Sequence, residues 1–101
     1  MTKKIPGHTQ RRVRLMKIEH RARLCSAFGN RLKVLRVEKG LTPTQFSIRC
    51  GIDSSNLRKY ENGEREPGLA IIVIMAKSLG ITHQDLLAFE FELPDSGLTT
   101  S

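Results

Sequence analysis

The chain has 101 residues, a mass of 11.4 kDa and a formal net charge of +7. A chain of this length can bury one hydrophobic core, and 39% hydrophobic with 27% charged residues is ordinary for a globular domain. No apolar run approaches the roughly 20 residues that cross a bilayer, and no secretory signal follows the basic start, so we expect a cytoplasmic protein that enters no membrane. Two distant cysteines and three scattered histidines lack metal-ligand spacing, which predicts no metal or other cofactor.

The positive charge is concentrated in the N-terminal part of the chain. Residues 1–39 hold twelve Lys or Arg against two acids, whereas residues 40–101 hold five against eight. Such a basic segment is typical of proteins that bind nucleic acid or an anionic membrane, and it also occurs as a merely solvated tail. Charge alone does not choose among these three.

The first predicted elements are an arm over residues 1–9 and a basic helix that begins at about Gln10. From Gln10 to Lys39 the apolar residues recur at helical spacing and no proline intervenes. The basic helix either continues into a helix over residues 28–38 or breaks just before it, and Gly40 marks the end.

The clearest start signal in the chain is at Thr42. Thr42 can cap a helix, Pro43 suits its first position, and Gln45 completes a capping box. This helix is expected to end at Cys50, because Gly51 allows a sharp turn.

A second short helix should follow this turn immediately. Asp53 or Ser54 caps it, and it runs to about Asn62. Two short helices joined by a tight glycine-containing turn form a helix-turn-helix unit.

The last predicted elements are helices over Leu69–Leu79 and His83–Phe89. Beyond them Phe89, Phe91 and Leu93 alternate with acidic residues, which is a strand-like pattern.

A series of motifs runs in order from residue 28 to about residue 88. They are F-G-N-R-L-K-V-L-R at 28–36, K-G-L-T at 39–42, C-G-I-D at 50–53, Y-E-N-G at 60–63, E-P-G-L at 66–69 and A-K-S-L-G-I at 76–81. In order and spacing they resemble the motifs of the lambda-repressor-like (Cro/cI, or XRE) DNA-binding domain.

The resemblance implies an all-α, five-helix domain, to which the residues outside it add a basic N-terminal helix and a short tail of strand-like pattern. We expect a basic arm or helix over 1–25, the helix-turn-helix domain over 26–89 and the tail over 90–101. It also implies an ion pair between Arg36 and Glu61. The expected core residues are Leu32, Leu35, Leu41, Phe46, Ile52, Leu57, Leu69, Ile72, Met75, Leu79, Leu86 and Leu87.

The function implied is that of a sequence-specific transcriptional regulator, such as a repressor, of bacterial or phage origin. It would bind double-stranded DNA as a homodimer, with the recognition helix at about Ser54–Asn62 in the major groove, and it would not be an enzyme. Asn56 could bond an adenine edge with two hydrogen bonds. The expected DNA-binding residues are Thr44, Gln45, Ser54, Ser55, Asn56, Arg58, Lys59, Asn62, Arg65, Arg11, Arg12 and Arg14.

The residues also allow a function of another class. The helical domain could bind a protein as an adaptor, with the basic arm as a nonspecific nucleic-acid tether. No small-molecule substrate is expected, because four Phe, one Tyr and no Trp offer little to line a ligand pocket.

Two features depart from the family pattern. Pro43 stands where relatives usually carry a Gln that contacts the DNA backbone, and Ser54 likewise replaces a frequent Gln. The helix from residue 69 is apolar almost all round because of Ile71 and Ile74, and Ile48 adds to this surplus. Either the N-terminal helix, through Val13, Met16 and Leu24, or a second subunit should cover these residues.

Overall fold

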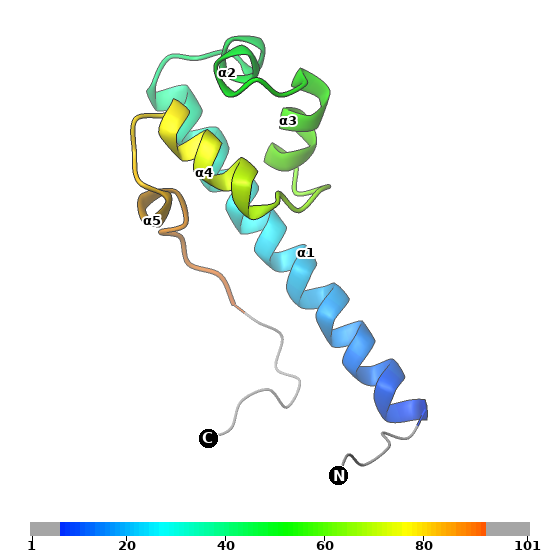
Figure 1. Cartoon of the computed structure of the whole chain (residues 1–101). Coiled ribbons are helices and arrows are strands. Elements are labelled where there is room, and N and C mark those ends of the chain that lie inside the picture. Colours follow the sequence, from blue (N-terminus) through cyan, green and yellow to red (C-terminus); the bar gives the residue numbers. More distant parts are fainter. Residues whose placement is uncertain (1–6, 93–101) are drawn as a thin grey trace.

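The computed structural model describes the backbone of residues 7–92 and the side chains of residues 17–92. Over residues 7–92 the chain forms five helices and no strand (Figure 1). The helices are α1 (Gly7–Glu38), α2 (Pro43–Cys50), α3 (Ser54–Glu61), α4 (Leu69–Ser78) and α5 (His83–Leu86). The predicted all-α, five-helix fold is confirmed. None of these helices is both long enough and apolar enough to span a membrane.

The basic N-terminal helix is not a separate element, because α1 runs without a break from Gly7 to Glu38. At 1.5 Å per residue its 32 residues extend about 48 Å. The helices α2 to α5 gather around its C-terminal half, and its N-terminal part projects beyond them (Figure 1). We call residues 7–24 the N-terminal extension.

Helix α1 continues through Gly29 because this glycine is needed for close packing against α3. A Cβ atom at position 29 would lie 2.4 Å from the carbonyl oxygen of Glu61 and 2.6 Å from that of Tyr60. The missing side chain therefore lets α1 lie directly against the last turn of α3. The glycine serves helix packing here, and it does not end the helix.

The capping residues set the limits of α2 and α3 as the sequence predicts. Thr42 and Gln45 form the capping box, with the Thr42 amide 2.9 Å from Gln45 Oε1 and the Gln45 amide 3.1 Å from Thr42 Oγ1. Gly51, at a φ of 68°, ends α2 in the left-handed conformation that a glycine adopts easily. Asp53 caps α3 two residues later.

The core lies between the C-terminal half of α1 and the four shorter helices. It consists of Phe28, Leu32, Phe46, Cys50, Leu57, Tyr60, Met75, Ala76, Leu79 and Leu86, with partly buried apolar residues packed around them. The prediction that Leu69 and Leu87 belong to the core is wrong. Leu69 is 83% exposed because it is the first residue of α4 and points away from the core, and Leu87 is 40% exposed because α5 has already ended.

The segment after α5 is neither helical to Phe89 nor a strand. The helix ends at Leu86, and residues 88–92 are irregular, while Leu93 lies outside the described residues. The Phe89 ring instead packs edge-on against Phe28, with the ring centroids 6.4 Å apart, and it also contacts Phe91. The alternating aromatic pattern thus reflects packing on a helix, since no neighbouring strand is present over residues 7–92 to pair with it.

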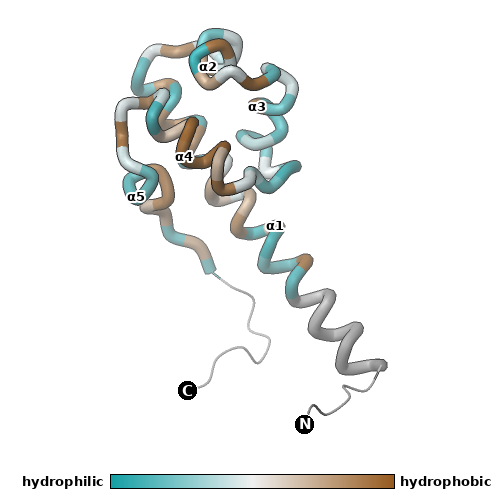
Figure 2. Tube along the Cα trace, in the orientation of Figure 1, coloured by the Kyte–Doolittle hydropathy of each residue, from teal (hydrophilic) through white to brown (hydrophobic). Residues whose placement is uncertain are grey.

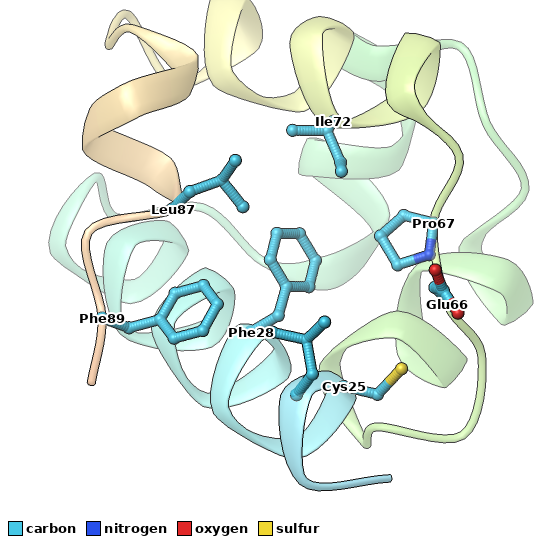
Figure 3. Close-up of a pocket in the computed structure, with 8 residues that line it drawn as sticks. Cys25, Phe28, Glu66, Pro67, Ile72, Leu87 and Phe89 are labelled. Carbon is cyan, nitrogen blue, oxygen red and sulfur yellow. The ribbon is translucent and has the colours of Figure 1, made fainter. Parts of the chain in front are cut away.

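A cavity of about 80 Å³ remains where this segment covers the core. Phe28, Ile72, Leu87 and Phe89 line it on the apolar sides, and the Glu66 carboxylate lies at its edge (Figure 3). Cys25 also lines the cavity, and burial raises the pKa of its thiol.

Candidate nucleic-acid interface

The position of α3 depends on a buried ion pair with α1. Arg36 Nε lies 2.6 Å from Glu61 Oε2, and Arg36 Nη2 lies 3.1 Å from Glu61 Oε1, so the two side chains form a bidentate pair. Arg36 Nη1 donates a further hydrogen bond of 2.6 Å to the Leu41 carbonyl. Both partners are less than 10% exposed. The pair implied by the resemblance is confirmed, and Glu61 fixes α3 to the scaffold.

The two faces of α3 differ sharply in exposure. Leu57, Tyr60 and Glu61 are buried against the rest of the domain. Ser55, Arg58 and Lys59 are exposed, and Ser54 and Asn56 are half-buried at the start of the helix. Of the residues expected to contact DNA bases, Ser55, Arg58 and Lys59 therefore lie on the accessible side of α3, and no other described element covers them.

Asp53 holds the first turn of α3 through its side chain. Its carboxylate accepts hydrogen bonds from the Ser55 hydroxyl and, at 3.2 Å, from the Ser55 amide. The hydroxyl contact is the main reason why the pKa of Asp53 is lowered. Ser55 is thus partly engaged in capping its own helix, which the sequence did not reveal.

Asn56 and Arg65 are joined by a hydrogen bond that spans the end of α3. Arg65 Nη1 lies 2.7 Å from Asn56 Oδ1, although the residues are nine positions apart. Sequence reasoning selected both residues separately and missed their contact. Nothing in the spacing signals it, because Arg65 follows the turn at Asn62-Gly63 and reaches back.

The other residues expected beside the recognition helix also lie at the surface. Thr44 and Gln45 are exposed in the first turn of α2, and the Gln45 oxygen is occupied by the capping box. Asn62 is exposed at the end of α3, where its amide nitrogen donates to Glu64 Oε2 at 3.1 Å. All three side chains are thus accessible to solvent, although Gln45 and Asn62 already have hydrogen-bond partners within the chain.

The three arginines of the arm are not brought beside α3. Arg11, Arg12 and Arg14 lie on the N-terminal extension, at the opposite end of α1 from α2, and their side chains are outside the described range. Within the extension Lys17, Arg21 and Arg23 are exposed, and Arg21 Nε pairs with Glu66 Oε1 at 2.9 Å.

Helix α4 is apolar along most of its length, in contrast with α3 (Figure 2), and apart from Lys77 its exposed residues are apolar as well. Leu69, Val73 and Ile74 are 83%, 49% and 40% exposed, and Ile48 on α2 is 74% exposed. Ile71 instead packs partly against the core.

We expected the N-terminal extension to cover this face of α4, but its described side chains do not. Leu24 is one of the residues that line the cavity described above, and the N-terminal part of α1 continues away from α4 (Figure 1). The side chains of Val13 and Met16 are outside the described residues.

A helix-turn-helix unit with a polar outward face on its second helix is the structure of a DNA-binding domain. Residues 32–86, more than half of the chain, match the family model HTH_3, described as helix-turn-helix. The chain belongs to this XRE, lambda-repressor-like family of DNA-binding transcriptional regulators.

Named relatives and solved structures agree with this assignment. The chain is 33% identical over 66 residues to the HTH-type transcriptional regulator y4dJ of Sinorhizobium fredii, covering 65% of this chain and 86% of the relative. It is 34% identical over 62 residues to the HTH-type transcriptional repressor RghR of Bacillus subtilis, covering 60% of this chain but only 46% of that protein. The crystal structure of the restriction-modification controller protein C.AhdI from Aeromonas hydrophila superposes with a TM-score of 0.61 at 34% identity, covering 61% of this chain and 94% of that one.

Proposed function

We propose that the chain binds an operator by inserting the exposed face of α3 into the major groove. The observation that supports this most directly is the division of α3 into a buried face and an exposed face that carries Ser55, Arg58 and Lys59. A major groove about 12 Å wide admits one helix, and serine, asparagine and lysine can all donate to base edges there. Ser54 and Asn56 lie at the end of the helix that approaches the bases in such a complex.

The flanking residues would hold the domain on the DNA backbone. Thr44 and Gln45 are exposed in the first turn of α2, and Asn62 and Arg65 are exposed just after α3, so these side chains are free to make the phosphate contacts that would fix the register of the helix. Arg11, Arg12 and Arg14 would add contacts that do not depend on sequence, in keeping with the basic arm over residues 1–25, the DNA-binding domain over 26–89 and the tail over 90–101. The proposal includes no catalytic step, and it places the protein in the cytoplasm, where bacterial or phage DNA is found.

We further propose that two copies associate through the outward face of α4. This face combines Leu69, Val73 and Ile74 in one apolar surface, and such surfaces are seldom left open to water. To read two half-sites on one side of the duplex, a symmetric pair would have to present its two α3 helices about 34 Å apart.

DNA binding is tested by comparing an operator, selected from random duplexes, with unselected DNA at several salt concentrations. A regulator is expected to prefer the operator by at least about 10³-fold, whereas a tether of the adaptor class would bind both DNAs alike and lose affinity steeply with salt. The double variant Arg58→Ala/Lys59→Ala should lose the preference. The matched variant Arg49→Ala/Lys33→Ala, which removes two exposed cations from α2 and α1, should keep it.

Association is tested by sedimentation of Val73→Asp. The charge on the apolar face should convert the protein to a monomer, while Asn30→Asp, an equal charge on the exposed side of α1, should leave the mass of the pair unchanged. A wild-type chain that sediments as a monomer at high micromolar concentration would rule out this interface.

A further inference from the structure

The hydrogen bond between Arg65 and Asn56 fixes which way the Asn56 amide faces. An arginine guanidinium has only donors, so the amide must turn its oxygen toward Arg65, as the 2.7 Å distance from Nη1 to Oδ1 requires. This orientation follows from the chemistry of the partner.

The neighbours of Arg65 leave it free to make this contact. Glu64 accepts a hydrogen bond from Asn62, and Glu66 pairs with Arg21. The two acids adjacent to Arg65 in sequence therefore have partners of their own. The guanidinium extends instead to Asn56, on the exposed side of α3.

The contact leaves the pair with an excess of donors among its free hydrogen-bonding groups. The Asn56 oxygen keeps one lone pair beside the Arg65 guanidinium, and the other free groups are the two N–H groups of Nδ2 and the unused N–H groups of Arg65. An asparagine that bonds adenine accepts from the adenine amino group with its oxygen. Here that amino group would have to approach next to a cation that carries only donors, so Asn56 in this orientation is poorly suited to that role.

The base edges of the major groove differ in what they offer to such a pair. Guanine presents two adjacent acceptors, O6 and N7, and thymine presents one. Adenine places an amino donor beside its N7, and cytosine offers an amino donor. A surface on which donors predominate matches guanine better than it matches the amino groups of adenine and cytosine.

We propose that Asn56, positioned by Arg65, selects a guanine in each half-site, which replaces the adenine expected from an isolated asparagine. Arg65 is a positioning residue in this mechanism, because it acts by fixing the amide of Asn56. The inference rests on the proposed insertion of α3 into the major groove and specifies one base that the helix recognises.

The experiment is selection of bound sequences from a random duplex pool by the full chain and four variants. Asn56→Ala should erase the base preference at one position of each half-site and so identify that position. Arg65→Ala frees the Asn56 oxygen, so the guanine-to-adenine ratio at this position should fall about 5- to 150-fold, the range that one bidentate contact contributes. The double variant should match Asn56→Ala at this position, because Arg65 acts there through Asn56.

Arg49→Ala provides the matched control. It removes an exposed arginine at the end of α2, and it should leave the preference at every position unchanged. Melting curves of all four variants verify that each is folded.

The outcomes separate this inference from the proposed function. Enrichment of adenine at the position that depends on Asn56 would overturn the inference while leaving DNA recognition by α3 intact. The inference would also fail if Arg65→Ala weakened every sequence equally without altering that one preference. If the wild-type chain enriched no sequence at all, the proposed function and the inference would fall together.

Discussion

The helices α3 and α4 are close in length, at eight and ten residues, and both contribute to the same core, yet they show opposite surfaces to the outside. The outward positions of α3 are Ser55, Arg58 and Lys59, whereas those of α4 include Val73 and Ile74. Burial in the core constrains only the inner stripe of each helix. The outer stripe is free to match what the helix meets, which in the proposed complex is a charged, hydrated groove for α3 and an apolar protein surface for α4.

The largest expected effect comes from removing the support of α3. Arg36→Ala should lower the free energy of unfolding by about 3–5 kcal/mol, because it leaves the buried Glu61 carboxylate without its partner. Denaturant unfolding measures the loss, with Lys33→Ala, an exposed cation on the same helix, as the control. Equal midpoints for the two variants would contradict the role given to the ion pair.

A smaller loss of stability should follow from a methyl group at the contact between α1 and α3. Gly29→Ala places a Cβ against the carbonyls of Tyr60 and Glu61, which should destabilise the protein by about 1–3 kcal/mol despite the better helix propensity of alanine. Asn30→Ala, one residue along on the exposed side, should be neutral or slightly stabilising. A gain in stability from Gly29→Ala would mean that α3 can move aside without cost.

The contrast between the outer faces is tested without unfolding either helix. Lys59→Ala should lower the salt slope of DNA binding by about 1, since one positive charge is lost from the DNA-facing side of α3, and it should leave the molecular mass in solution unchanged. Val73→Ala, the matched truncation on α4, should mainly weaken self-association and should have only a small effect on the salt slope. Titrations at several salt concentrations, together with sedimentation, distinguish the two effects.

The smallest expected effect concerns pH and the start of α3. The pKa of Asp53 is lowered below its ordinary value of 3.8 by the Ser55 hydroxyl. The ionised cap therefore stabilises the folded state above that ordinary value, and this stabilisation is lost as the pH falls through the lower folded-state pKa. Melting temperatures should decline less steeply with acid in Asp53→Asn, which caps without titrating, than in the wild type. Parallel declines would show that Asp53 adds nothing to acid sensitivity.

The ends of the helices could be predicted wherever a capping residue defines them. Thr42, Gly51 and Asp53 act within a few residues of themselves, so α2 begins and ends as expected and α3 begins as expected. Helical periodicity was less informative where a helix starts or stops. Leu69 fits the apolar repeat of α4, but at its first position no part of the core lies opposite.

Contacts between segments could not be predicted from local patterns. Whether α1 would break at Gly29 depends on how closely α3 approaches it, which is a property of the folded chain. The contact of Arg65 with Asn56 crosses a turn that leaves no periodic signal. The candidate residues on α3 were accessible to sequence reasoning because the family motifs locate that helix, whereas their hydrogen-bond partners were not.

Because α1 is unbroken, it fixes the distance between two parts of the protein that are far apart in space. The N-terminal part of α1 carries the arginine-rich segment, and its C-terminal half contacts α3 through Gly29 and Arg36. One continuous helix therefore sets the distance and angle between the arginine-rich segment and α3. Any duplex that touches both ends has to present its backbone at that fixed reach. Bending of the DNA, or a proline that hinges α1, would then change how much of the helix can be engaged at once.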